Sequence, residues 1–207
     1  MNPPYRTGLL SVARDRFDAV SASAIVAVIM SIAVLYFLAA KFGFQLAFAT
    51  KQVSSVWPPT GLAAVAYLLF GWRVWPGVFL GAFWINAVSD EPLLTAAGIA
   101  VGNSAAGLVG IGLLHRLIDF NPRLDNVPSV LGWAVFVAAA GCIVSASNGV
   151  VQLVLGGIIP WSAAPSVWWV WWMGDTMGVL LFGPLLLALI WPPGERRSAR
   201  QWAEIAG

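Results

Sequence analysis

Charged residues, cysteine and histidine are scarce in this 207-residue chain. Only 10% of the residues are charged and 59% are hydrophobic, whereas charged residues make up roughly a quarter of a soluble globular domain. So few charges cannot cover a water-facing surface, and the composition therefore indicates a protein of the lipid bilayer. The length allows about six membrane spans of roughly 20 residues each. Only short loops are left over, which excludes a soluble catalytic domain.

The scarcity of reactive and metal-binding side chains excludes further kinds of site. His115 is the single histidine and Cys142 the single cysteine, so neither a disulfide framework nor a histidine-rich metal site can form. A haem held by one His and one Met is the only haem ligation left open. The sequence has no glycine-rich phosphate loop, nucleophile elbow or nucleic-acid patch. We therefore expect no enzyme activity, no cofactor, no metal and no nucleic-acid partner.

Apolar runs predict six membrane spans. They lie at about 21–40, 57–71, 74–88, 93–114, 129–156 and 161–191. The first run is longer than the apolar core of a cleaved signal peptide, so we interpret it as an anchor helix that is retained. Together the runs predict an all-α, polytopic membrane bundle with a cytoplasmic segment at 1–20, a membrane-embedded bundle at 21–191 and a cytoplasmic tail or linker at 192–207.

The distribution of cations predicts the orientation of these spans. If the N-terminus is cytoplasmic, the inner segments contain all nine arginines and the outer segments contain only Lys41 and Lys51. Inner loops of membrane proteins carry the excess of Lys and Arg. Both termini are therefore expected in the cytoplasm, with Asp90-Glu91 outside. The short segments 57–71 and 74–88 could instead form a re-entrant hairpin from the outer face, and only the side on which Arg73 lies distinguishes the two topologies.

The two long segments at 129–156 and 161–191 allow two interpretations. Ser145 to Gly149 and Gly174 to Gly178 could interrupt them, as in the broken helices of transporters, or each could be one long tilted helix. Small residues also recur every fourth position, which favours close helix packing in a compact bundle. The best example is the set Gly98, Gly102, Ala106 and Gly110. A homodimer through such a face is left open.

Asp175 is the most informative polar residue within a predicted span. A carboxylate near the bilayer centre costs roughly 2.5 to 3.5 kcal/mol on insertion scales, so it normally faces the bundle interior and has a partner. Asn86, Asn103 and Asn148 are its expected companions, because amides can join helices or hold a polar ligand. Two interpretations remain: a structural carboxylate, or a ligand or proton site.

Aromatic and proline residues define the rest of the candidate site. Trp57-Pro58-Pro59-Thr60-Gly61 cannot continue a helix, and lipid tolerates such backbone only where protein or trapped water satisfies it. Five tryptophans crowd between Trp161 and Trp172. They fit an interfacial belt or an aromatic-lined pocket, with Trp171 and Trp172 closest to Asp175. The candidate ligand-binding or signal-sensing residues are thus Asp175, Asn103, Asn148, Asn86, Trp171, Trp172, Trp57, Pro58, Pro59 and Thr60.

An ordered series of motifs resembles one known family. The segments are Trp57 to Ala63, then Phe70 to Phe83 with Asn86, followed by Ile99 to Asn103, Gly149, and Trp171 to Asp175 with Gly178 and Pro184. Over roughly residues 25–191 the chain resembles the first class of bacterial membrane-associated sensor (MASE) domains. The resemblance implies an input module of the bacterial inner membrane, usually fused ahead of a histidine kinase or of domains that make or degrade cyclic di-GMP. Members tend to continue with further spans, whereas this sequence stops soon after Trp191-Pro192-Pro193.

The sequence therefore predicts a non-catalytic sensory domain. We expect an unidentified small-molecule ligand or membrane state to shift the helix packing, and the last helices to pass this shift to a cytoplasmic signalling output domain or kinase. The alternative from another class is a small-molecule binding or transport subunit of the membrane.

Overall fold

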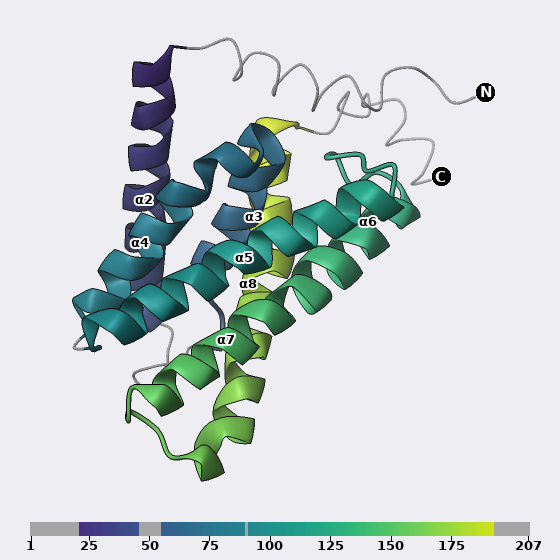
Figure 1. Ribbon diagram of the computed structural model, residues 1–207. Helices are drawn as coiled ribbons and strands as arrows, with labels where there is room; N and C mark the ends of the chain where they lie inside the picture. Colours follow the sequence, from purple (N-terminus) through teal and green to yellow (C-terminus); the bar gives the residue numbers. More distant parts are fainter. Residues whose placement is uncertain (1–20, 46–54, 90, 193–207) are drawn as a thin grey trace, which may run out of the picture.

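A computed structural model describes residues 21–45, 55–89 and 91–192, which form helices and connecting turns with no strand among them (Figure 1). The predicted all-α architecture is confirmed. The elements in chain order are α2 (Ala22–Gln45), α3 (Pro58–Phe70), η1 (Trp72–Val74), α4 (Trp75–Ala87), α5 (Leu93–Leu117), α6 (Val127–Gly132), η2 (Trp133–Gly141), α7 (Cys142–Leu155), η3 (Trp161–Ala163) and α8 (Ala164–Ile190).

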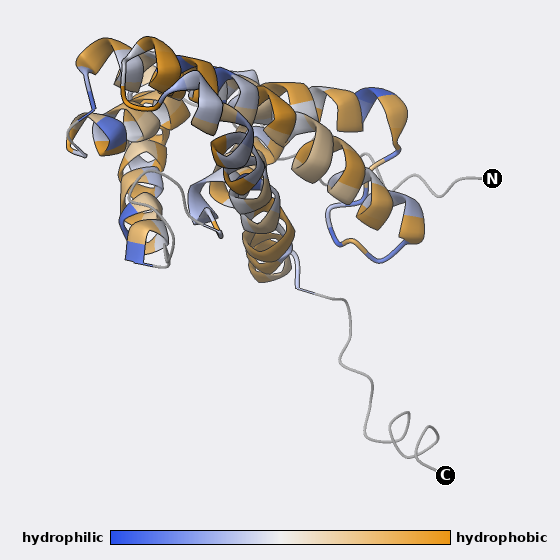
Figure 2. Cartoon of the chain, turned by 90° about the horizontal axis from the view of Figure 1, so that it is seen from below, coloured by the Kyte–Doolittle hydropathy of each residue, from blue (hydrophilic) through white to orange (hydrophobic). Residues whose placement is uncertain are grey.

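Four stretches of helix are long and apolar enough to cross a bilayer. They are Ala22–Gln45, Leu93–Leu117, Val127–Leu155 and Trp161–Ile190. In Figure 2 hydrophobic colours dominate these helices. The chain is therefore an integral membrane domain. The helix α3 has 13 residues, so at about 1.5 Å per residue it measures about 20 Å, less than the roughly 30 Å hydrocarbon core.

The helices pack in neighbouring pairs. Extensive contacts join α2 to α4, α5 to the long helix α6–η2–α7, and α3 to α8. The start of α2 and the end of α8 lie toward the same end of the molecule (Figure 1). At that end α3 turns through η1 into α4, and Gly71 at the turn has a φ of 71°, a left-handed conformation that glycine adopts readily.

Small residues bring the helices close together, as their spacing predicts. A Cβ atom added to Gly102 would overlap the side chain of Asn148, and one added to Gly141 would lie 2.9 Å from the carbonyl oxygen of Ala106. A Cβ at Gly81 would lie 2.6 Å from the Cβ of Tyr36. Each contact joins two different helices, so these faces pack inside the bundle.

Of the two interpretations of the long segments, the continuous helix is correct and the broken helix is wrong. The helix α7 continues through Ser145–Gly149, and α8 continues through Gly174–Gly178. Ser145 donates its hydroxyl hydrogen to Asn103, and Asn148 donates to the carbonyl of Gly98. Because these side chains bond to another helix, they do not compete for the backbone of their own. An irregularity does occur earlier, where Trp133–Gly141 forms a π-helix.

Candidate functional site

The carboxylate of Asp175 lies near the middle of α8 and is 1% exposed. Its Oδ1 atom accepts a hydrogen bond of 2.6 Å from the Thr60 hydroxyl. Its Oδ2 atom is buried and has no hydrogen-bond partner among the described residues. The other polar side chains against it are Ser145 and Trp171, and both are neutral. A buried carboxylate in neutral surroundings is costly unless it binds a proton or a cation.

The Trp57-Pro58-Pro59 motif positions Thr60 at this carboxylate. The two prolines occupy the first helical positions of α3, where a missing N–H costs no helical hydrogen bond. The backbone N–H of Trp57 donates to the carbonyl of Gly174 over 2.8 Å. A Cβ atom on Gly178 would collide with the carbonyl of Trp57, so glycine is needed for this approach. The positive end of the α3 dipole therefore begins beside Asp175, where it favours negative charge.

Further hydrogen bonds connect the neighbourhood of Asp175 to the other helices. Ser145 on α7 donates to the Oδ1 atom of Asn103 on α5 over 2.7 Å, and accepts from the Trp171 indole over 3.2 Å. Asn103 donates to the Tyr36 hydroxyl on α2 over 3.1 Å. With the Thr60–Asp175 bond, these contacts connect polar side chains from α2, α3, α5, α7 and α8 in the bundle interior. We call Tyr36, Thr60, Asn103, Ser145, Trp171 and Asp175 the polar cluster.

Several candidate residues of the sequence do meet here. Asp175, Thr60, Asn103 and Trp171 belong to the polar cluster, and Trp57 contributes the backbone contact described above. Pro58 and Pro59 are buried at the start of α3.

The remaining candidates bond elsewhere. Asn148 donates to the carbonyl of Gly98 over 2.6 Å, and the Trp172 indole donates to the carbonyl of Ala139 over 2.9 Å. Asn86 donates to Ala82 in its own helix. The first two therefore join α7 to α5 and α8 to η2, while Asn86 supports α4 alone.

Tyr36 and Ser145 are not among the site residues that the sequence indicates. The sequence marks Ser145 as the start of the Ser145–Gly149 stretch, a possible interruption of its helix. Tyr36 is the one tyrosine within the first apolar run. Its hydroxyl was the available signal, since a buried tyrosine hydroxyl usually finds a hydrogen-bond partner.

The tryptophan-rich stretch is partly a belt and partly a set of interhelical contacts. Trp161 and Trp169 are 66% and 54% exposed, as expected of residues that face the membrane interface. Trp168 and Trp172 stack with ring centres 6.1 Å apart. Trp168 also donates to the hydroxyl of Ser147 on α7. These rings attach the first half of α8 to its neighbours.

A metal centre has no set of ligands in the described part of the chain, where no three His, Cys, Asp or Glu side chains come together. The polar cluster offers one carboxylate, together with hydroxyl, amide and indole groups. Such a set can hold a proton, a small cation or the cationic end of an organic molecule through Oδ2 of Asp175.

Comparison with known proteins identifies similar sequences. The family model MASE1, membrane-associated sensor domain 1, matches residues 28–207. The "Probable diguanylate cyclase DgcE" of Escherichia coli (strain K12) is 22% identical over 166 residues, which cover 76% of this chain and 14% of that protein. The chain thus spans only a small part of the length of this curated relative. No solved structure matches.

Proposed function

Because the chain belongs to the MASE1 family of membrane-associated sensor domains, we propose that its bundle detects a ligand or membrane state through Asp175 and relays the change to a cytoplasmic output. Domains of this family are non-catalytic membrane sensors. The similar protein is named as a diguanylate cyclase, which supports an output that makes or degrades cyclic di-GMP. A histidine kinase is the other output that the family resemblance implies.

The proposed topology has six crossings, with both termini in the cytoplasm of a bacterial cell and the bundle at 21–191 in its inner membrane. The common end of the molecule at which α2 begins and α8 ends (Figure 1) supports an even number of crossings, with both termini on one side. Arg73 at the α3–α4 turn lines a cavity together with His115, which lies two residues before the end of α5 at Leu117. This position of Arg73 favours a crossing over a hairpin that returns halfway.

The observation that carries the sensing proposal is the Oδ2 atom of Asp175, which is buried without a hydrogen-bond partner among the described residues. Oδ1 of the same carboxylate joins α8 to α3 through Thr60. Binding of a proton or cation at Oδ2 would neutralise the charge that the start of α3 favours. The packing of α3 against α8 would then change, and α8 ends at the cytoplasmic side from which an output would continue.

The charge of Asp175 is therefore expected to set the signalling state. We would fuse the chain to a diguanylate cyclase domain and measure cyclic di-GMP in cells over a range of growth phases and medium pH. Asp175→Asn keeps the size and hydrogen bonding of the side chain but deletes its charge. The variant is expected to insert and fold like the parent, with an output fixed at one level across the conditions.

The matched control is Thr176→Val, because Thr176 is the next residue of α8 and its hydroxyl bonds to the carbonyl of Ala138 on η2. This variant loses a polar contact of α8 but retains the carboxylate, so it should keep the parent's range of output. If Asp175→Asn also kept that range, Asp175 would be a structural residue and the sensing proposal would fail.

A further inference from the structure

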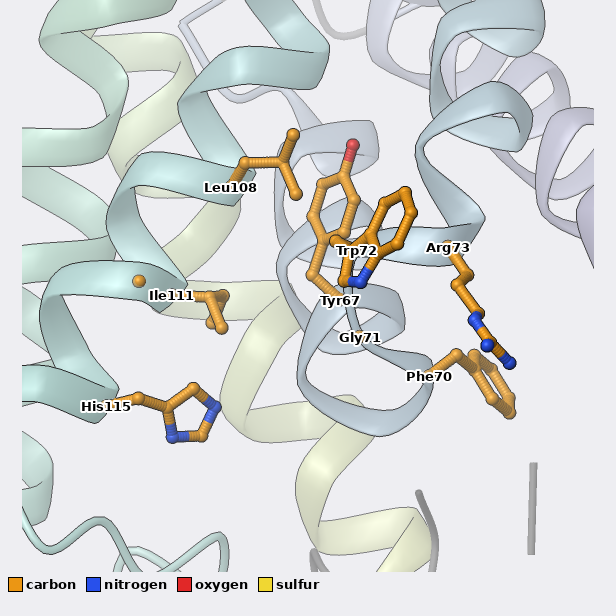
Figure 3. Close-up of a pocket in the computed structure, with 9 residues that line it drawn as sticks. Tyr67, Phe70, Gly71, Trp72, Arg73, Leu108, Ile111 and His115 are labelled. Carbon is orange, nitrogen blue, oxygen red and sulfur yellow. The ribbon is translucent and has the colours of Figure 1, made fainter. Parts of the chain in front are cut away.

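The cavity lined by Arg73 and His115 lies apart from the polar cluster, between the α3–α4 turn and the last turns of α5. Its volume is about 420 Å³, within the range of roughly 300 to 1,000 Å³ typical of small-molecule sites. The lining residues are Tyr67, Phe70, Gly71, Trp72, Arg73, Leu108, Ile111, Gly112 and His115. Figure 3 shows the side chain of His115 directed from α5 toward α3 across this space.

The lining combines an apolar wall with basic groups. Arg73 and His115 are its two basic residues, and no acidic residue lines it. A guanidinium is always charged and offers several N–H donors, while an imidazole donates whether it is neutral or protonated. The Tyr67 hydroxyl donates to the carbonyl of Ser104 over 3.1 Å, so this tyrosine presents its ring rather than its polar end. The electrostatics of the cavity therefore favour an anion.

Glycine at position 112 keeps the cavity open. A Cβ atom added there would meet no atom within 4 Å, in contrast to the crowded glycines along the same helix. Trp72, which lines the cavity, is 69% exposed. An exposed aromatic surface of this kind in a basic cavity suits a molecule with an anionic head and an acyl chain, and basic pockets between spans are known to hold anionic lipid headgroups.

We propose that this cavity binds the phosphate of an anionic ligand, with His115 as a hydrogen-bond donor, Arg73 as a positive charge at the α3–α4 turn, and the aromatic wall against the adjoining apolar part. The phosphate could come from the headgroup of a membrane phospholipid or from a soluble phosphate compound. Both sources present the same negatively charged phosphate oxygens to these two basic residues. Occupation of the cavity would connect the α3–α4 turn to α5.

The test uses the purified full chain in a neutral detergent. Short-chain phosphatidylglycerol is titrated into the protein, and binding is followed by the melting temperature and by native mass spectrometry. Phosphatidylcholine of equal chain length is titrated in the same way, to test whether binding needs a net negative charge on the lipid. Inorganic phosphate is added alone and as a competitor. We expect one phosphatidylglycerol to bind and raise the melting temperature, and phosphatidylcholine to bind more weakly.

Two variants and one control locate the binding. The double variant Arg73→Gln/His115→Gln should weaken binding about tenfold or more, because hydrogen bonds to charged groups are among the strong ones. Gly112→Leu should weaken it similarly by filling the cavity, and it tests the site even if the double variant is unstable. Arg116→Gln is the matched control, since Arg116 is the neighbouring basic residue of α5 and does not line the cavity. Its affinity should stay close to that of the parent.

The lipid titration and the inorganic phosphate titration together distinguish the two sources of phosphate. Binding of the lipid without competition by millimolar inorganic phosphate assigns the cavity to a headgroup, whereas stabilisation by inorganic phosphate alone assigns it to a soluble compound. Equal binding of both lipids, with no effect of the double variant, would overturn the proposal, since the cavity would then hold only an acyl chain or detergent. Unchanged binding to Gly112→Leu would also overturn it.

Discussion

Ser145 shows how much a single hydroxyl can connect in this bundle. It is 1% exposed, and its oxygen serves as donor to Asn103 and as acceptor for the Trp171 indole. The three side chains belong to α7, α5 and α8. In lipid no water replaces a lost bond of this kind, although interhelical hydrogen bonds in membranes average only about 0.6 kcal/mol. Ser145 therefore positions the Asn103 and Trp171 side chains relative to each other, in addition to stabilising the bundle.

Ser145→Ala is expected to lower the free energy of unfolding by about 1 to 2 kcal/mol, because it leaves two partly buried polar groups, on Asn103 and Trp171, without their partner. The measurement is the thermal or denaturant-induced unfolding of the purified chain in detergent. Ser31→Ala is the matched control: the Ser31 hydroxyl is exposed and bonds only to Ala27 in its own helix. An equal effect of both substitutions would show that the Ser145 contacts contribute nothing beyond a local helical bond.

At the scale of the element, two glycines of α5 lie in different surroundings. Gly102 lies against Asn148, so that no further atom fits there, whereas the space around Gly112 is open. Both glycines lower the helix propensity of α5, by about 1 kcal/mol each relative to alanine. Only the first is required by packing. The spacing in the sequence anticipates this distinction, since Gly102 belongs to the series of small residues at every fourth position and Gly112 does not.

Gly102→Leu is therefore expected to destabilise the bundle by roughly 1 to 3 kcal/mol or more, because a larger side chain forces α5 and α7 apart. Gly112→Leu makes the identical substitution on the same helix and should be neutral or slightly stabilising. Melting temperatures of both variants in detergent without added lipid test the difference. If Gly102→Leu melted like the parent, its face would meet lipid and the assigned packing of α5 on α7 would be wrong.

At the scale of the whole molecule, the sequence predicts the helices better than it predicts the contacts between them. The apolar runs locate α2, α3, α4, α5, the long helix α6–η2–α7 and α8, because lipid requires each spanning backbone to satisfy its own hydrogen bonds. The sequence indicates both Thr60 and Asp175 as candidate residues, but it names Asn86, Asn103 and Asn148 as the companions of Asp175 and does not predict the Thr60 contact. The contacts of the Tyr36 and Ser145 hydroxyls were not predicted either, since a side chain's partner on another helix depends on helix rotation and crossing, which apolar composition leaves undetermined.

The continuity of α7 and α8 was equally hard to predict. Ser145 to Gly149 is a composition that breaks helices in water, where the side chains and water compete for the backbone. Here Asn148 bonds to α5, and the Trp171 ring lies against Gly149. Contacts with neighbouring helices therefore convert a helix-breaking composition into a packing surface. The same reasoning applies to Gly178, which the backbone of Trp57 approaches closely.

The orientation of the molecule is the last prediction, and it follows from charge. Arg73 lies in the turn between α3 and α4, Arg116 in the last turn of α5, and Arg123 in the turn that follows α5. These segments lie toward the end of the molecule where α2 begins and α8 ends (Figure 1), whereas Lys41 is near the C-terminal end of α2. The positive-inside rule places the arginine-rich end in the cytoplasm. Asp90 lies outside the described residues, so the neighbouring Ser89 of the outer loop is the better position to label.

Single cysteines at Ser89 and Arg73 are introduced in a Cys142→Ala background, in which the one native thiol, buried in α7, is absent. A membrane-impermeant thiol reagent is applied to intact cells or to inside-out vesicles. We expect residue 89 to react only from the outside and residue 73 only from the cytoplasmic side, because the segments 57–71 and 74–88, together with their adjoining turns, then complete one crossing each. Labelling of residue 89 from the cytoplasm would reverse the orientation. Labelling of residue 73 from the outside, with residue 89 unchanged, would instead make α3 and α4 a re-entrant hairpin, and the basic cavity beside His115 would then be reached from the outer leaflet.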